Sequence, residues 1–244
     1  MKRIQHHFDG FKQRYGSPKI AHKLREEGWV VATKTVAKLM KAMGLRSRVV
    51  KKYKATTNSK HNQPVYDNVL NRQFQVDAPN RVWVTDITYV ATKQGWVYLA
   101  SVMDLFSRKI VGWSMGSRMT KELVLDALDM AYKRQKPKPG LVHHSDRGSQ
   151  YASTEYRERL DSYEMIGSMS RKGNCYDNAC IESFHSVIKK ELVYLTTFQT
   201  RQQAYEAIHS YIELEYNRIR IHSSIGYLTP HLCEKRYYEQ QQVA

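Results

Sequence analysis

Alternating apolar and polar residues in the middle of the chain predict a β-strand. Over residues 82–89, one face carries Val82, Val84, Asp86 and Thr88, and the other carries Trp83, Thr85, Ile87 and Tyr89. Gln94 and Gly95 supply a turn, and further apolar runs follow at residues 96–104 and 107–115. Three strands joined by such short connections predict an antiparallel meander.

Helical and strand patterns alternate after the meander. Thr120 suits the N-cap of a helix, because apolar residues recur at helical spacing behind it. The elements expected next are a strand at 141–146, a helix from Ser153, a strand at 165–169 and a helix capped by Asp177 or Asn178. This order predicts an α/β fold of ribonuclease H-like type, a five-stranded mixed sheet flanked by helices. Periodicity leaves the order of the strands in the sheet open.

Two short helices near the N-terminus have the pattern of a helix-turn-helix. Ser17 and Pro18 suit the start of the first helix, and Thr33 suits the cap of the second. The lysines expected on the outward side of the second helix are Lys34, Lys38 and Lys41. In such motifs the second helix enters the DNA major groove. The alternative is a small helical hairpin with a solvated lysine face.

Positive charge is concentrated ahead of the predicted sheet. The chain has a formal net charge of +16, and residues 1–80 hold 17 Lys and Arg against 5 Asp and Glu, a net of +12. Residues 81–244 are nearly balanced, at +4. This asymmetry favours a nucleic-acid-binding region ahead of a catalytic one. The alternative is that the surface lysines only keep the protein in solution.

Composition and periodicity together suggest four parts of the chain. We expect a helix-turn-helix-like segment at 1–47, a basic linker at 48–80, a catalytic core at 81–195 and a C-terminal helical extension at 196–244. No apolar run is long enough to span a bilayer, and the N-terminus lacks a signal-peptide core. The odd count of three cysteines favours reduced thiols in a cytoplasmic protein.

Three acidic residues lie beside the strongest structural signals. Asp86 lies within the first strand, Asp146 ends a strand before a glycine turn, and Glu182 lies near the start of an amphipathic helix. Thirty-five positions separate Asp146 from Glu182. Carboxylates held on rigid elements can bind hard divalent cations against a phosphate. A single carboxylate, by contrast, is usually just a solvated charge.

Basic residues near Glu182 are candidates for DNA contact. Glu182, His185, Ser186 and Lys189 share one helical stripe, because they recur at i, i+3, i+4 and i+7. One helix can therefore present a metal-binding carboxylate and, two turns on, a cation for phosphate. The cations expected to neutralise the DNA backbone here are Arg171, Lys172, Lys189 and Lys190.

Several motifs resemble those of the DDE transposases of bacterial insertion sequences. The segments WVTDITYV, HSDRGSQY and SMSRKGNCYDNACIESF are similar to the catalytic motifs of OrfB-type members, whose core is like that of retroviral integrases. YNRIRIHSSIGYLTP resembles the closing motif of this family, and YGSPKI with TVAKLMKAMGLRSR resembles its helix-turn-helix-like segment. The resemblance implies that Asp86, Asp146 and Glu182 are the catalytic triad and that Lys189 contacts DNA. His185 departs from the pattern, since relatives usually carry an aromatic residue such as Phe there.

The resemblance also implies an activity and its partners. We expect DNA cleavage and strand transfer with two Mg²⁺ ions, for which Mn²⁺ can substitute. The expected partners are element ends and target DNA, further copies of the chain on DNA, and the OrfA product or an OrfA–OrfB fusion. The family usually has further residues before the YG segment, and the fusion adds a leucine zipper, so we expect end recognition to need those parts. The expected location is the bacterial cytoplasm, in association with the nucleoid. Two alternatives remain: a truncated, DNA-binding regulator without activity, and a ribonuclease H-type nuclease.

Overall fold

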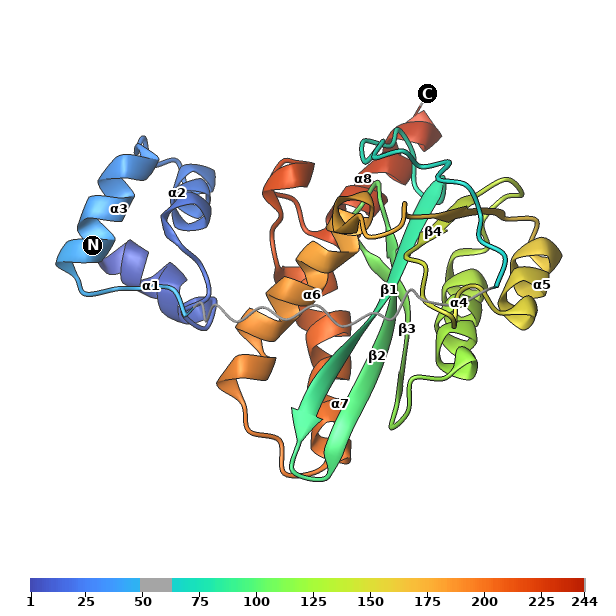
Figure 1. Cartoon of the computed structure of the whole chain (residues 1–244). Helices are drawn as coiled ribbons and strands as arrows, with labels where there is room; N and C mark the ends of the chain where they lie inside the picture. Colours follow the sequence, from blue (N-terminus) through green and yellow to red (C-terminus); the bar gives the residue numbers. More distant parts are fainter. Residues whose placement is uncertain (49–62, 244) are drawn as a thin grey trace.

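The computed structural model describes residues 1–48 and 63–243, and it consists of an N-terminal helical unit and an α/β core (Figure 1). Much of the predicted basic linker, residues 49–62, lies outside the described residues. The helical unit lies to one side of the core, and the core is built around a central sheet.

The sheet has five strands in the order β3-β2-β1-β4-β5. Their bounds are β1 Val82–Thr92, β2 Gly95–Asp104, β3 Ile110–Gly116, β4 Val142–Ser145 and β5 Ile166–Met169. The first three pair antiparallel as a meander, whereas β4 pairs parallel with β1 and with β5. The prediction of a five-stranded mixed sheet is therefore confirmed, and β1 lies at its centre.

Helices cover both faces of the sheet (Figure 1). On one face α4 (Lys121–Gln135) and α5 (Thr154–Ser162) enclose a core that includes Trp83 and Val102. On the other face α6 (Ala179–Glu191) and α7 (Arg201–Ser210) enclose a core that includes Val84 and Leu99. These two layers follow directly from the alternation along β1.

Helix α4 lies very close to β3 at Gly112. A Cβ atom on this residue would come within 2.2 Å of the Ala127 carbonyl oxygen and 2.7 Å of the Ala131 Cβ. A side chain at this position would therefore push the helix off the sheet.

The helix starts agree with the sequence to within one residue. Thr120 is the N-cap of α4, and the Ser153 side chain caps α5 by accepting a hydrogen bond from the Tyr156 amide. Ser17 and Thr33 are instead the first helical residues of α2 (Ser17–Glu26) and α3 (Thr33–Ala42), behind Gly16 and Ala32. A difference of one residue is within the ordinary uncertainty of helix ends.

The N-terminal unit has one more helix than the sequence predicts. Helix α1 (Lys2–Gly10) packs on α2, and Ile4 and Phe8 join Ile20 and Val36 in a small separate core. Polar residues, including two histidines, interrupt its apolar pattern, so periodicity does not show this helix.

The C-terminal segment joins this unit to the core. A π-helical segment, Tyr211–Ile219, follows α7, and α8 (Pro230–Val243) ends the chain. Glu215 forms ion pairs with Lys12 and Arg14, and the Tyr15 hydroxyl accepts a 3.1 Å hydrogen bond from the Ile221 amide. The helical unit therefore contacts the C-terminal segment within and just before the predicted closing motif. Short 3₁₀ helices occur at Cys175–Asn178, Val193–Leu195 and Ser223–Ile225.

Candidate active site

One of the three predicted carboxylates lies on β1, and a second directly follows the neighbouring parallel strand, β4. In the β1–β4 pairing Val84 lies opposite His144, which is the last pair, and the same register continued for two residues leads to Asp86 and Asp146. Strand β4 ends at Ser145, whereas β1 continues to Thr92. Neighbouring strands lie about 4.8 Å apart. The two residues therefore lie side by side at the carboxyl end of β4, where β1 loses its neighbour.

Buried polar contacts fix β4, the strand that leads to Asp146. The His143 and His144 rings lie in the interior, with the His143 Nε2 2.7 Å from the Tyr156 hydroxyl and the His144 Nδ1 2.8 Å from the Ser168 hydroxyl. Burial lowers the pKa of His143 to about 3 and that of His144 to about 4, so both rings are neutral near pH 7. Beyond the strand, the Gly148 amide donates a 2.9 Å hydrogen bond to the Asp146 carboxylate.

Glu182 reaches the same place from helix α6. The Asn178 side chain donates a 3.0 Å hydrogen bond to the carbonyl oxygen of Thr85, the residue before Asp86. This bond fixes the start of α6 against β1, and Glu182 follows one turn later. Partial burial and the negative charge of Asp86 raise the pKa of Glu182. The two carboxylates are thus close enough to repel each other.

The residue types suit a hard divalent cation, but the side chains do not form a closed cage. Across residues 1–48 and 63–243, no three or more His, Cys, Asp and Glu side chains lie close enough together to hold a metal ion. The structure therefore brings Asp86, Asp146 and Glu182 to one end of the sheet without placing them at ligand distances. Carboxylate oxygens are suitable ligands for hard cations, and bound cations would offset the repulsion between the negatively charged side chains. Both properties fit a site in which the three carboxylates come together around metal ions.

His185 is a neighbour of the site whose contact the sequence did not reveal. It is only 6% exposed, and its Nδ1 lies 3.3 Å from the Asp86 carboxylate. Its place on the stripe of Glu182 was the signal that could have suggested this contact. The ring can therefore help to orient the Asp86 carboxylate.

Lys189 lies beyond Glu182 on the same helix, as predicted. Its amino group is 4.8 Å from the centre of the Tyr89 ring. Burial lowers the pKa of Lys189, and the negative charge of Asp86 acts against this effect. Lys189 is therefore within electrostatic reach of the Asp86 carboxylate. Lys190, the next residue, is half-buried.

Arg171 and Lys172 lie in the loop before α6. The Arg171 guanidinium donates hydrogen bonds of 2.9 and 2.7 Å to both carboxylate oxygens of the buried Asp177, and Arg72 also pairs with Asp177. Hydrogen bonds from Arg171 hold the pKa of Asp177 well below its usual range. Asp177 thus anchors the loop, although the sequence suggested only a helix cap. Arg171 is half-exposed and Lys172 is exposed, so DNA contact by either residue stays a prediction.

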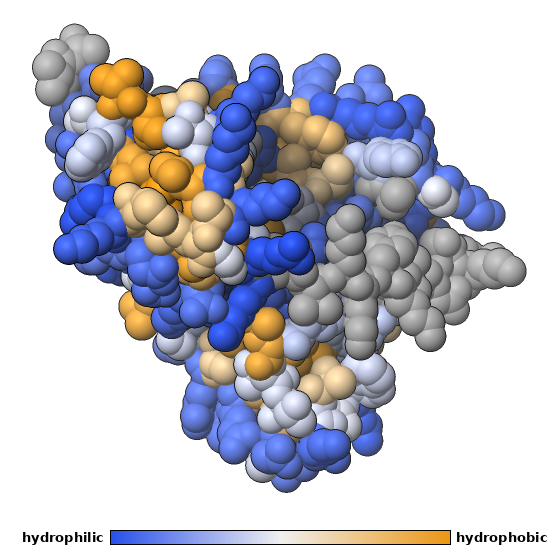
Figure 2. Space-filling view, turned by 90° about the vertical axis from the view of Figure 1, so that its left-hand side faces the viewer, coloured by the Kyte–Doolittle hydropathy of each residue, from blue (hydrophilic) through white to orange (hydrophobic). Residues whose placement is uncertain are grey.

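The predicted basic face of the helical unit is open to solvent. Lys34, Lys38 and Lys41 are all exposed on α3, opposite the buried Val36 and Met40. Figure 2 shows that hydrophilic side chains surround apolar patches on the side of the molecule that carries this unit. The arrangement suits a helix presented to a polyanion.

Comparison with known proteins places the chain in a family. Integrase core domain models match residues 76–175 and 165–230, and an HTH-like domain model matches residues 1–53. Transposase InsF for insertion sequence IS3A from Escherichia coli is 43% identical over 94% of this chain and 80% of its own length. The chain belongs to the insertion-sequence transposases with an integrase core.

A second relative agrees with this assignment, and one solved structure shares the fold. The insertion element IS600 uncharacterized 31 kDa protein of Shigella sonnei is 46% identical over 93% of this transposase and 84% of its own length. A chain of the simian T-cell lymphotropic virus intasome, in complex with a regulatory subunit of PP2A, shares the fold with a TM-score of 0.51. That match has 17% sequence identity and covers 85% of this chain and 66% of the viral structure's chain.

No helix in the described part of the transposase is both long and apolar enough to cross a membrane.

Proposed function

We propose that this transposase cleaves and joins DNA at Asp86, Asp146 and Glu182, with two Mg²⁺ ions as cofactors. The observation that carries the proposal is the register of β1 and β4, which, continued two residues past its last pair, leads to Asp86 and Asp146 beside the first turn of α6. When bound, the ions supply Lewis-acid activation of a water or a DNA 3′-hydroxyl and of the leaving oxygen. Mn²⁺ can take their place, because it accepts the same oxygen ligands.

The surrounding residues position the reacting groups. Asn178 fixes α6 to the backbone beside Asp86, and His185 contacts the Asp86 carboxylate. Lys189 holds a phosphate of the DNA end close to the carboxylates, with Lys190 and Lys172 along the same backbone. The contacts within the protein fix the triad, and the lysines fix the DNA relative to it before reaction; such positioning is a large part of what a protein contributes to phosphoryl transfer.

The helical unit supplies DNA binding away from the triad. The exposed lysines of α3 suit phosphate contact, and a helix of this kind enters the major groove in helix-turn-helix proteins. We infer that the chain works on element ends and target DNA as a homo-oligomer, together with an OrfA product or an OrfA–OrfB fusion. This work takes place on the DNA of the bacterial cytoplasm and nucleoid.

One assay tests the proposal. The purified chain is incubated with Mg²⁺ and with a labelled duplex, an RNA–DNA hybrid, or a duplex that bears a pre-cut element end. Joining of the pre-cut end to a second duplex supports the proposal. Cleavage of the hybrid alone would indicate a nuclease, and binding without reaction would indicate a regulator.

A further inference from the structure

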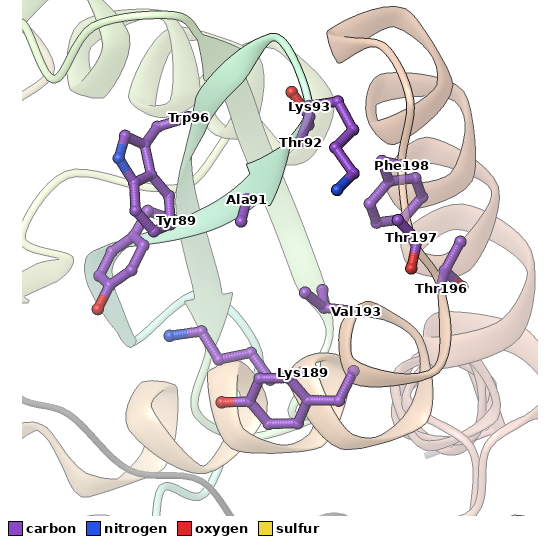
Figure 3. Close-up of a pocket in the computed structure, with 11 residues that line it drawn as sticks. Tyr89, Ala91, Thr92, Lys93, Trp96, Lys189, Val193, Thr196, Thr197 and Phe198 are labelled. Atoms are coloured by element: carbon purple, nitrogen blue, oxygen red, sulfur yellow. The ribbon is translucent and has the colours of Figure 1, made fainter.

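A pocket of about 760 Å³ opens beside the candidate active site, between the β1–β2 hairpin and the connection from α6 to α7 (Figure 3). Tyr89, Ala91 and Trp96 line its hairpin side, and Thr196 and Phe198 line the opposite side. Lys189 lines it as well, so one residue belongs both to the pocket and to the proposed binding site for the DNA end. Nothing in the proposed chemistry uses the rest of the pocket.

Aromatic side chains form one wall of the pocket. The Tyr89 and Trp96 rings lie 4.9 Å apart, edge to face, and Trp96 is 48% exposed. Figure 3 shows both rings on the hairpin side, with the small Ala91 between them and the opposite wall. In a core, a tryptophan would bury this surface. Its exposure in a pocket leaves an aromatic face available to a planar ligand.

The hairpin that carries the aromatic wall is held in place. Thr92 and Phe198 form a parallel β-bridge, and the Lys93 amide donates a 3.0 Å hydrogen bond to the Phe198 carbonyl oxygen. At its base the hairpin continues into the centre of the sheet. The two walls of the pocket are therefore held at a fixed separation before a ligand binds, so binding does not have to order them.

Two cations give the pocket its charge. Lys189 extends over the Tyr89 ring, and the Lys93 amino group points into the pocket from the hairpin (Figure 3). Among the lining residues there is no acidic side chain. This combination suits a ligand with an aromatic ring and a negative charge.

We propose that this pocket binds an unpaired nucleobase of the DNA strand that occupies the carboxylates. The base stacks on Trp96, and the adjoining phosphates contact Lys189 and Lys93. The inference rests on the proposed function, because Lys189 brings the strand from the triad to the pocket. A base must leave the duplex stack to offer its face, so the pocket selects DNA with a frayed or single-stranded end. Aromatic stacking and backbone cations are the usual means of binding single strands.

The experiment compares the affinities of the full chain for three probes, in EDTA so that no cleavage occurs. One is a blunt duplex, one carries a three-nucleotide single-stranded extension, and one carries the same extension with abasic residues. Both strand polarities are tested by fluorescence anisotropy. Loss of one stacked base corresponds to about a tenfold change in affinity. We expect the wild type to bind the normal extension about tenfold more tightly than the abasic one.

Variants locate the effect in the pocket. Trp96→Ala should bind both extensions equally, and Trp96→Phe, which keeps an aromatic face, should retain most of the preference. Tyr238→Ala is the matched control, because Tyr238 is also an exposed aromatic residue, at 45%, but lies on α8, outside both the pocket and the helical unit. This variant should keep the full preference. Circular dichroism checks that each variant is folded.

Three results would overturn the proposal. The first is that the wild type binds the normal and the abasic extension with equal affinity. The second is that the preference for the normal extension survives in Trp96→Ala. The third is that Trp96→Ala changes the oligomeric state and leaves the preference unchanged. The last would mean that a second copy covers the pocket. Joining of a blunt pre-cut end in Mg²⁺ is measured separately. If the wild type joins the end but shows no base preference, only the pocket proposal is wrong. If it shows the base preference but does not join the end, only the proposed strand transfer is wrong.

Discussion

Asp86 lies on strand β1 and Asp146 directly follows the neighbouring parallel strand β4, although fifty-nine positions separate the two residues in the sequence. Parallel pairing of Val84 with His144 sets the register of the two strands, and β4 ends just before Asp146. In a parallel pair, residues at the same level present their side chains to the same face. The backbone of the sheet therefore aligns the two carboxylates, and α6 adds Glu182 from the adjoining layer.

Removing one carboxylate charge should abolish strand transfer. Asp86→Asn, Asp146→Asn and Glu182→Gln each keep the shape of the side chain but weaken it as a ligand for Mg²⁺. DNA affinity should stay within about twofold of the wild type, because the basic segments carry it. Gel assays of end joining and anisotropy of DNA binding measure the two effects. Asp126→Asn, the same change at an exposed site on α4, should join normally. Wild-type joining by any triad variant would refute that residue's role.

The lysines of α3 should carry part of the salt dependence of DNA binding. Each phosphate contact that is lost flattens the slope of log K against log salt by about 0.9 on duplex DNA. The combined Lys34→Ala, Lys38→Ala and Lys41→Ala variant should therefore lower the slope by up to about 3. Binding is measured from low to moderate salt. Alanines at Lys133, Lys136 and Lys138 remove equal charge at exposed positions outside the helical unit and should change the slope less. An unchanged slope in the α3 variant would show that the helix is only a solvated face.

Local patterns predicted much of the fold and the positions of the candidate residues. Alternation placed Asp86 on a strand, and Ser153 caps its helix as expected. Both are properties of short segments. The strand order was not predictable in this way, because the parallel pairing of β4 with β1 depends on contacts far apart in the sequence.

Other features could not be predicted, because the sequence around an apolar or charged residue does not show which residue it contacts in the fold. Trp96 looks like a core residue of a strand, but it lies in the wall of an open pocket. Asp177 looks like a helix cap, but its carboxylate binds two arginines. In both cases the decisive contact comes from a distant part of the fold.

Asp177 should stabilise the fold in a pH-dependent way. Because Arg171 and Arg72 hold its folded pKa low, its contribution is present above the unfolded pKa of about 3.9 and is lost as the pH falls below that value. Asp177→Asn should lower the free energy of unfolding by about 2 kcal/mol at pH 7, the usual scale for hydrogen bonds to a charged group. Urea unfolding at pH 7 and at steps down to pH 3 measures this. The difference from the wild type should shrink in acid, whereas the exposed control Asp161→Asn should change little at any pH. A pH-independent difference would contradict the ion-pair explanation.

Lys189 should hold the DNA end without taking part in metal binding. It is the seventh residue after Glu182 on α6, about 10.5 Å further along the axis and on nearly the same side. Its amino group lies over Tyr89, facing the pocket and within reach of the charge of Asp86. Lys189→Ala should therefore lower end joining about tenfold, the scale of one lost charged contact. Mg²⁺ binding, followed as the shift in Tm on adding the ion, should be preserved.

A conservative variant and a salt series separate this role of Lys189 from simple packing. Lys189→Arg should recover much of the joining, since an arginine supplies the same charge and also packs on an aromatic ring. Lys133→Ala removes an exposed lysine from α4, on the other face of the sheet, and should join like the wild type. If the Lys189→Ala variant joins normally at low and moderate salt, its amino group only covers Tyr89, and the DNA end must be held by other cations. If joining falls and the deficit grows with salt, the charge of Lys189 acts on the DNA.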